Sequence, residues 1–458
     1  MTKKPNLLLV LTDQQSCWTL GCYGGTLIET PHIDRLAAEG MTLDHCITPS
    51  AVCTPSRGCL LTGQYPHQHG ARHNDLELNR DARTWAHQLS DAGYHTGYAG
   101  KWHLDGKTRP GWVHPERACG FRDARFMFNR GHWKKITQDV PNAEPTVFVE
   151  DIIGDEESYP TDWLTRITQD FLNDQAQNRP DQPFAFMLSI PDPHGPYRVR
   201  KPYDTMYDPA AMPIPETFDQ TDLPDWAAEL RREHYGRDHP DPKGLLRHNM
   251  SQYCGEVKLI DDRIGDLLAT LGANGQLDET IVVFCSDHGD YMGEHGLMEK
   301  NWVYESTYRV PFIVRYPEAV PRGSRLDRLV SFVDVQSTLL GLMGVPAAGT
   351  EAGRDASPLL RGEAVDGWVD EAFLHHASLN MAGIFTDRFE LAHVRDSEDS
   401  VLFDRREDPL QVNNLFRDPA YAEEIDRLNA RILEHHDEVG TPGQDWLRAA
   451  ITAAPTAR

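Results

Sequence analysis

Three continuous apolar runs mark the chain, and each leads into polar residues. They cover residues 6–12, 183–190 and 281–286. A short apolar run of this kind is typical of a strand that is buried on both faces of a parallel sheet. Segments with helical periodicity lie between the runs, with glycine at or near several ends, at residues 32–40, 85–93 and 252–271. Strands that alternate with helices predict an α/β sandwich.

The pattern changes after about residue 362. Short alternating segments bounded by charged turns follow at residues 371–375, 383–386 and 389–394, as in an antiparallel sheet. We therefore expect a catalytic α/β domain over residues 1–362 and a smaller α+β domain with a tail over residues 363–458. Prolines interrupt residues 203–245, which predicts a long excursion over the surface.

Composition restricts the partners of the protein. The 458 residues carry a formal net charge of -25, which repels nucleic acid and anionic membranes, so we expect neither as a partner. An anionic substrate would need local cations at its site. The first residues show no secretory signal, and no run approaches the ~20 apolar residues of a membrane span. Eight cysteines without CxxC spacing indicate reduced thiols. These features predict a soluble, cytoplasmic protein.

Polar side chains follow the predicted strands directly. The first run leads into Asp13 and Gln14, the third into Asp287 and His288, and the second into a loop that carries His194. Because ligands collect at the carboxyl ends of strands in open α/β sheets, these side chains are expected to converge. Carboxylate and amide oxygens favour calcium or magnesium, whereas an imidazole favours manganese. The alternative is that the two aspartates only cap the helices after their strands.

The segment CTPSRGCLLTG predicts a short helix beside an anion site. Thr54 is the expected N-cap, Pro55 the first helical residue and Gly63 the end. Cys53 would then lie just before a helix N-terminus, where backbone N–H groups and the helix dipole favour an oxyanion. Arg57, one turn on, can add a charge-assisted contact. A tetrahedral anion fits this place.

Structural interpretations compete with the functional ones. A single cysteine is most often a small buried hydrophobe, which is the interpretation adopted for Cys59. The histidine-rich segment with His67, His69 and His73 could suggest zinc but is more typical of solvated surface. Lys300 taken alone would be a solvated charge.

The motif C-x-P-S-R followed after three residues by L-T-G resembles the signature of the formylglycine-dependent sulfatases, a family of the alkaline phosphatase-like superfamily. Further blocks match in the family's order: residues 100–103 (GKWH), the Pro193-His194 loop, residues 286–289 (SDHG), Lys300 and the closing segment 402–415. The resemblance implies a sandwich with a large mixed, mostly parallel sheet flanked by helices, and a smaller C-terminal antiparallel sheet.

The resemblance also implies a mechanism for sulfate monoester hydrolysis, of the arylsulfatase type. A maturating, formylglycine-generating enzyme would oxidise Cys53 to an aldehyde, whose hydrate attacks sulfur and forms a covalent sulfo-enzyme intermediate. One divalent metal ion, Ca²⁺ or Mn²⁺, would be bound by residue 53 together with Asp13, Gln14, Asp287 and His288. The family pattern gives proton transfer to the alcohol to His194 and Lys300, proton removal from residue 53 to His103, and the positive field around the sulfate to Arg57, Lys101 and Lys300.

Two alternatives stay open. The pairs Asp-Gln and Asp-His also resemble the family's phosphonate monoester and phosphodiester hydrolases, whereas the GKWH block favours the sulfatases. A non-catalytic metal-binding relative would leave Cys53 unmodified. Substrate choice is assigned to residues 105–161, which include Trp112, Arg125, Arg130, His132 and Trp133. The tail from Gly440, with Trp446, could dock on a second subunit of a homo-oligomer or on its own chain.

Overall fold

The computed structural model describes residues 4–106, 113–136, 152–235, 239–376, 380–397 and 399–453. Within these ranges the largest element is a nine-stranded sheet with the order β4-β3-β5-β1-β6-β8-β2-β7, and with β9 paired to β2. Five of its strand pairs are parallel and three are antiparallel. The strands are β1 (Asn6–Thr12), β2 (Met41–Ile47), β3 (His95–Lys101), β4 (Asp123–Phe128), β5 (Phe184–Ser189), β6 (Thr280–Ser286), β7 (Arg309–Val310), β8 (Phe312–Arg315) and β9 (Ser324–Ser331). The predicted mixed, mostly parallel sheet is confirmed.

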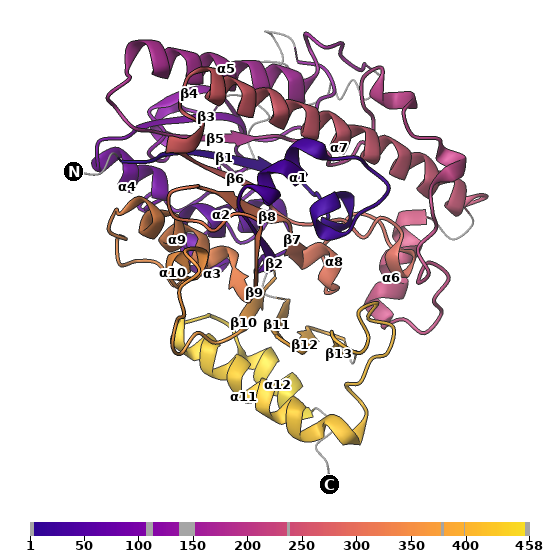
Figure 1. The fold of residues 1–458 in the computed structure, drawn as a ribbon. Helices are drawn as coiled ribbons and strands as arrows, with labels where there is room; N and C mark the ends of the chain where they lie inside the picture. Colours follow the sequence, from indigo (N-terminus) through magenta and orange to yellow (C-terminus); the bar gives the residue numbers. More distant parts are fainter. Residues whose placement is uncertain are drawn as a thin grey trace.

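Strand β1 shows why the sheet is buried on both sides. Leu7, Leu9 and Leu11 belong to one apolar cluster, and Leu8 and Val10 belong to another on the opposite face. All five are at most 1% exposed, and full burial of such a side chain contributes roughly 1.5–3 kcal/mol. Helices cover both faces (Figure 1), namely α1 (Pro31–Ala38), α5 (Pro160–Asn178) and α7 (Pro242–Ala273) on one and α2 (Cys53–Thr62), α4 (Trp85–Asp91), α9 (Val335–Met343) and α10 (Ser357–Leu360) on the other.

Helix α7 is longer than the sequence pattern predicted. It begins at Pro242, where the Asp241 side chain accepts a hydrogen bond from the Gly244 N–H at 2.8 Å. An acidic N-cap followed by proline is a helix start signal, so residues 242–245 were wrongly assigned to the excursion and the predicted helix began ten residues too late. The rest of that excursion contains two 3-10 turns and helix α6 (Asp225–Tyr235).

A second sheet lies at the C-terminal end of the chain. Strands β10 (Glu371–His375), β11 (Met381–Thr386), β12 (Phe389–Val394) and β13 (Val401–Asp404) pair antiparallel in sequence order, which confirms the predicted antiparallel sheet and adds β13 to it. Helices α11 (Ala422–Glu438) and α12 (Asp445–Ala453) lie beside this sheet (Figure 1). Leu447 of α12 is 1% exposed in the main core, so the tail docks on its own chain. The domain boundary at residue 362 stays a prediction, and among the described residues no helix is long and apolar enough to span a membrane.

Aromatic and imidazole rings from both parts of the chain pack where the two sheets meet. The His375 ring stacks between those of His67, on the short helix α3 (Pro66–His69), and His436, at 5.3 and 4.5 Å between ring centroids. His435 Nε2 lies 3.0 Å from His375 Nε2, and Tyr65 packs against both rings. We call His67, His375, His435 and His436 the histidine seam. Because His67 packs against the rings of this seam, solvated surface was the wrong interpretation of His67.

His69 is also buried, against helix α2. A Cβ atom on Gly58 would lie 2.3 Å from Cε1 of the His69 ring, so only glycine leaves room for it. The Ala71 N–H donates to His69 Nδ1 at 3.2 Å, and burial lowers the pKa of His69 to about 3. Of the three histidines in this segment, only His73 is exposed as predicted.

The histidine seam predicts that the protein loses stability in acid. Burial lowers the pKa of His436 from 6.5 to about 4. Between these two pH values the unfolded chain binds a proton at His436 that the folded chain does not bind. The free energy of unfolding should therefore fall as pH drops below 6.5, by about 1.4 kcal/mol per pH unit for this group, and level off near pH 4. Urea unfolding at several pH values measures the slope. His436→Gln should make it shallower, and the exposed His114→Gln should not; equal slopes in all three proteins would contradict the assignment.

Candidate active site

Strand register brings the predicted side chains together. Strand β1 lies between β5 and β6, with Thr12 paired to Ser286 and Leu11 to Ser189. The next residues of β1 and β6, Asp13 and Asp287, therefore leave the sheet at the same level. The loop with His194 follows β5, and Lys101 ends β3 beside it. The expected convergence at one edge of the sheet is what the structure shows.

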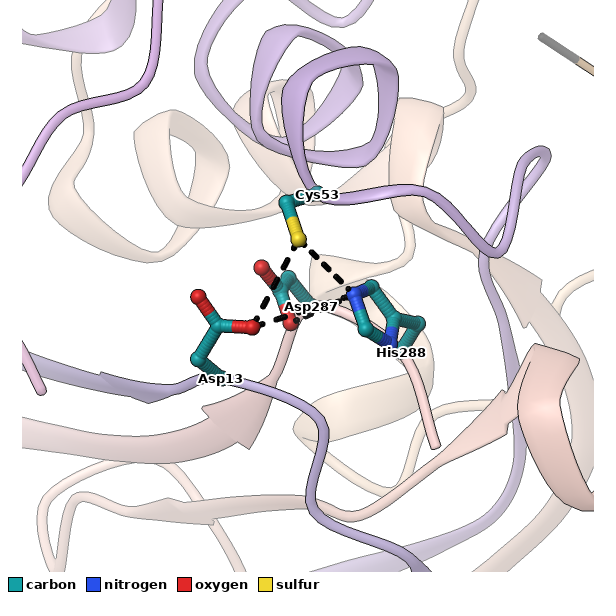
Figure 2. A group of neighbouring side chains, drawn as sticks. All are labelled: Asp13, Cys53, Asp287 and His288. Atoms are coloured by element: carbon teal, nitrogen blue, oxygen red, sulfur yellow. Dashed lines mark hydrogen bonds and ion pairs between the residues drawn. The ribbon is translucent and has the colours of Figure 1, made fainter. Parts of the chain in front are cut away.

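Four side chains form a compact buried group, drawn in Figure 2. The ligand atoms of Asp13, Cys53, Asp287 and His288 all lie within 4.8 Å of one another. Cys53 Sγ is 3.1 Å from His288 Nε2 and 3.6 Å from Asp13 Oδ1, while His288 Nε2 is 3.6 Å from Asp287 Oδ1. None of the four is more than 1% exposed. We call this group the acid–cysteine cluster.

The acid–cysteine cluster fits a divalent cation. Burial would lower the pKa of His288, but Asp287 and Cys53 together outweigh it and the pKa is raised. Burial would also raise the pKa of Asp13, yet Lys101, His194 and Arg57 hold it well below its usual range. The cluster thus stabilises positive charge at its centre. Two carboxylates with an imidazole and residue 53 are a donor set for calcium or manganese.

Arg57 holds the two acids in place. Its Nε donates to Asp287 Oδ2 at 2.9 Å and its Nη2 to Asp13 Oδ2 at 3.0 Å. Its Nη1 donates to the Lys101 carbonyl and to Ser189 Oγ at 2.9 and 2.7 Å. All three guanidinium nitrogens donate to protein groups, so Arg57 orients the two acids and adds its positive charge to the site.

Helix α2 starts earlier than predicted. Cys53 is its first residue and Val52 its N-cap, because the Ser56 N–H already donates to the Val52 carbonyl at 3.1 Å. The assignment of Thr54 as N-cap is wrong, since its hydroxyl donates to the His103 carbonyl at 2.8 Å. Gly63 ends the helix with φ 65°, as predicted. Residue 53 is therefore fixed by the helix and faces the acids from its first turn.

Two lysines and two histidines line the next part of the site. Lys101 Nζ lies 2.5 Å from Asp13 Oδ2 and 2.8 Å from His132 Nε2. The His132 ring stacks on that of His194 with centroids 3.7 Å apart and 5° between the planes. Lys300 Nζ lies 2.6 Å from His194 Nε2. Two stacked imidazole rings thus lie between the ammonium groups of Lys101 and Lys300.

Proton positions on His194 follow from its partners. An ammonium group has no lone pair, so Lys300 donates and Nε2 of His194 accepts. The other ring nitrogen, Nδ1, then carries the proton and donates to the Gly195 carbonyl at 2.7 Å. Burial, His132 and Lys300 lower the pKa of His194 well below its usual range, while charges led by Cys53 raise that of Lys300 against the effect of burial. Lys300 is consequently the protonated member of the pair.

His103 is placed to accept a proton. It is 7% exposed, and its Nδ1 has no hydrogen-bond partner among the described residues. Burial, with Lys101 and Arg57 next in size, lowers the pKa of His103 well below its usual range. A neutral imidazole with a free buried nitrogen can act as a base.

Gln14 lies at the edge of the acid–cysteine cluster. Its backbone N–H donates to Asp287 Oδ1 at 3.1 Å. Its side-chain Oε1 accepts a hydrogen bond from Lys300, and its Nε2 donates to Asp290 Oδ2 at 2.5 Å. The amide oxygen thus faces the lysine, and this contact could not be predicted from the sequence.

Sequence reasoning also missed residues that support the site. His132 was noted only as a substrate contact, because the short apolar stretch of β4 that leads to it was not recognised as a strand. Lys134 Nζ lies 2.6 Å from both Asp192 Oδ1 and Glu256 Oε1, and thereby fixes the loop that carries His194. No local pattern indicates this buried ion triad, since its members come from three distant segments.

The segment assigned to substrate choice is only partly near the site. Arg130 pairs with Asp75, Arg125 pairs with Asp123 and Asp174 on the outside, and Trp133 packs on Phe128. His132 alone of the named residues joins the lysines described above. Trp112 lies outside the described residues.

Comparisons with known proteins agree over nearly the whole chain. The sulfatase family model matches residues 5–345, and a model for the C-terminal part of N-sulphoglucosamine sulphohydrolase matches residues 293–438. The chain is 28% identical to an N-acetylglucosamine-6-O-sulfatase of Bacteroides thetaiotaomicron, over 93% of this chain and 85% of that one. It is 29% identical to an arylsulfatase of Clostridium perfringens, over 97% and 98% of the two chains.

Solved structures show the same fold. A structure of BT4656 in complex with its substrate D-glucosamine-2-N,6-O-disulfate superimposes with a TM-score of 0.75, 26% identity and coverage of 97% of this chain and 99% of that one. A phosphonate monoester hydrolase from Silicibacter pomeroyi gives a TM-score of 0.77 at 22% identity, with coverage of 96% and 97%. At that identity the second likeness concerns the fold alone.

Proposed function

Because the chain belongs to the sulfatase family and is a sulfuric ester hydrolase, we propose that residue 53, oxidised from cysteine to formylglycine by a maturating enzyme, is its nucleophile. The observation that supports this most is the position of Cys53, 1% exposed at a helix start and in contact with Asp13 and His288. Oxidation of this cysteine to an aldehyde would give residue 53 its role as the nucleophile.

We propose that Asp13, Gln14, Asp287, His288 and residue 53 hold one divalent cation, Ca²⁺ or Mn²⁺. When bound, the ion would lower the pKa of a hydroxyl on residue 53 and draw charge from the sulfate oxygens. Arg57 keeps the two carboxylates at a fixed spacing for it. The bound cation would thus offset, within the site, the negative charge that would otherwise repel sulfate.

The lysines supply the remaining positive field. Lys101 has three N–H donors, of which Asp13 and His132 receive two. The third is available for a sulfate oxygen, and in a buried site such a contact is stronger than in water. We propose that His132, which accepts from Lys101 and stacks on His194, positions both groups.

Proton transfer is assigned to the other side of the sulfate. Lys300, kept protonated beside neutral His194, would donate to the oxygen of the departing alcohol. His103, neutral and with a free nitrogen, would take the proton from residue 53 when the sulfate leaves.

Replacing Lys300 with methionine should therefore harm poor leaving groups most. We expect kcat/KM for an alkyl or sugar sulfate to fall about 100-fold or more, and that for an activated nitrophenyl sulfate to fall far less, since an activated phenolate needs no proton. Steady-state kinetics on both substrates measures the difference. Lys243→Met, at a surface ion pair with Asp219, is the control and should change neither value. Equal losses on both substrates would show that Lys300 does not protonate the leaving group.

A sulfated sugar is the proposed substrate class. The relatives named for N-acetylglucosamine 6-sulfate and for a glucosamine disulfate support it. Phosphonate monoester hydrolysis is the second candidate, because Gln14 and His288 make the metal-binding group less negative than four carboxylates would. We expect kcat/KM for an aryl sulfate to exceed that for an aryl phosphonate monoester on one metal-replete preparation; the reverse order would favour the second candidate. Homo-oligomerisation and a cytoplasmic location stay predictions.

A further inference from the structure

The orientation of the Gln14 side chain is set by a residue outside the proposed catalytic group. A glutamine amide presents an oxygen on one side and an NH₂ on the other, and the two placements differ only by a rotation. Only the placement that turns the amide oxygen toward Lys300 and the acid–cysteine cluster offers an oxygen to a cation. Gln14 is fully buried, so water cannot satisfy a wrong placement.

Asp290 receives the NH₂ side of this amide. Its Oδ2 accepts from Gln14 Nε2 at 2.5 Å and from the Tyr197 hydroxyl at 2.6 Å, while its Oδ1 accepts from the Met292 N–H at 2.7 Å. Three donors thus point at a carboxylate that is itself 0% exposed. A carboxylate accepts hydrogen bonds and has none to donate. Asp290 can therefore bind the Gln14 NH₂ group but not the Gln14 amide oxygen.

The backbone of Asp290 is fixed as well. The Asp290 N–H donates to Ser16 Oγ at 2.8 Å, and the Ser16 hydroxyl donates back to the Asp290 carbonyl at 2.9 Å. The Tyr253 hydroxyl donates to the Gln14 carbonyl at 2.7 Å and so holds the other end of the contact. Neither partner can move away from the other without breaking these bonds.

Rotation of the Gln14 amide would create two repulsive contacts at once. Its oxygen would face the Asp290 carboxylate, and its NH₂ would face the Lys300 ammonium, which now donates to that oxygen. Buried polar groups left without a partner are strongly unfavourable. We infer that Asp290 is a positioning residue, which keeps the Gln14 oxygen turned toward Lys300 and the acid–cysteine cluster. This inference rests on the proposed role of Gln14 at the metal site.

The test compares Asp290→Asn in two backgrounds by calorimetric titration with Mn²⁺ and with Ca²⁺. In the native background the new asparagine side chain can face either side of the Gln14 amide, so that only Lys300 still favours the native placement, and we expect metal affinity to fall about 10- to 100-fold. In a Gln14→Glu background the native Asp290 would oppose a second carboxylate, whereas the asparagine amide of the double variant can donate to it. There the same substitution should strengthen metal binding. The sign of the effect should therefore reverse.

A merely structural role would not reverse sign. An equal loss of affinity in both backgrounds, or no loss in the native one, would overturn the inference. Asp334→Asn is the matched control, because Asp334 is also buried and accepts hydrogen bonds, from the backbone N–H groups of Ser331 at 2.9 Å and Arg354 at 2.7 Å. It should leave metal affinity unchanged. Since the readout is metal binding and not turnover, it stands even if the proposed sulfatase chemistry of residue 53 fails.

Discussion

Cys53→Ala is expected to lower kcat/KM for sulfate esters by at least about 1,000-fold, the order of loss typical when a nucleophile is removed. Alanine lacks the thiol that is oxidised to the aldehyde, so both the nucleophilic hydroxyl and one ligand of the metal-binding group are lost, while the pocket stays formed. Cys53 lies in contact with Asp13 and His288, so no other side chain can take its place without moving the helix. Steady-state turnover of an aryl sulfate measures the loss.

Cys59→Ala is the matched control for that variant. Cys59 lies in the same helix and is fully buried, but its Sγ approaches a polar side chain only at His69 among the described residues, at 3.7 Å. We expect a modest loss of stability, on the order of 1 kcal/mol, and unchanged kcat/KM. Full activity of Cys53→Ala would reject the proposed nucleophile, whereas the absence of activity in the native protein would favour the non-catalytic metal-binding alternative.

Asp13→Asn is expected to have the second largest effect, on both stability and activity. The Asp13 Oδ2 accepts from Arg57 at 3.0 Å and from Lys101 at 2.5 Å, and all three side chains are at most 1% exposed. Removing one charge from a buried ion group typically costs about 3–5 kcal/mol, because the partner charges stay buried. The same substitution removes an anionic ligand, so we expect kcat/KM to fall at least about 1,000-fold.

Denaturant unfolding with and without added Ca²⁺ or Mn²⁺ measures the first effect. The native protein should gain stability from the metal ion, and Asp13→Asn should gain little. Asp327→Asn serves as the control, since Asp327 pairs with His45 on the surface and its side chain is 86% exposed. An Asp13→Asn protein that is as stable as the native one and equally stabilised by metal would contradict the placement of Asp13 in the site.

The buried strands were the most predictable part of the fold. Residues 6–12 are apolar on both faces, and a parallel sheet covered on two sides accommodates that pattern. Parallel strands end at the same edge of a sheet, so the polar residues that follow them lie close together. This is why Asp13 and Asp287 could be identified as site residues from the sequence. The start of α7 was missed because the proline at 242 was taken as a break and not as a first helical residue.

Contacts between distant segments could not be predicted. The role of Arg57 depends on Asp13 and Asp287, and that of His132 depends on Lys101 and His194. Periodicity describes which residues are buried and says nothing about which polar groups meet across a site. The family resemblance supplied the roles of Cys53 and its neighbours, whereas the orienting contacts required the structure.

Alkylation of the tryptic peptide from Leu36 to Arg57 shows the chemical state of residue 53 in one measurement. That peptide contains two cysteines, Cys46 and Cys53. After denaturation and alkylation of fully active protein, mass spectrometry should find one alkyl group, on Cys46, and an aldehyde at position 53 that reacts with a hydrazide. Two alkyl groups on the peptide from fully active protein would mean that Cys53 is an unmodified thiol, and would contradict the proposed aldehyde nucleophile.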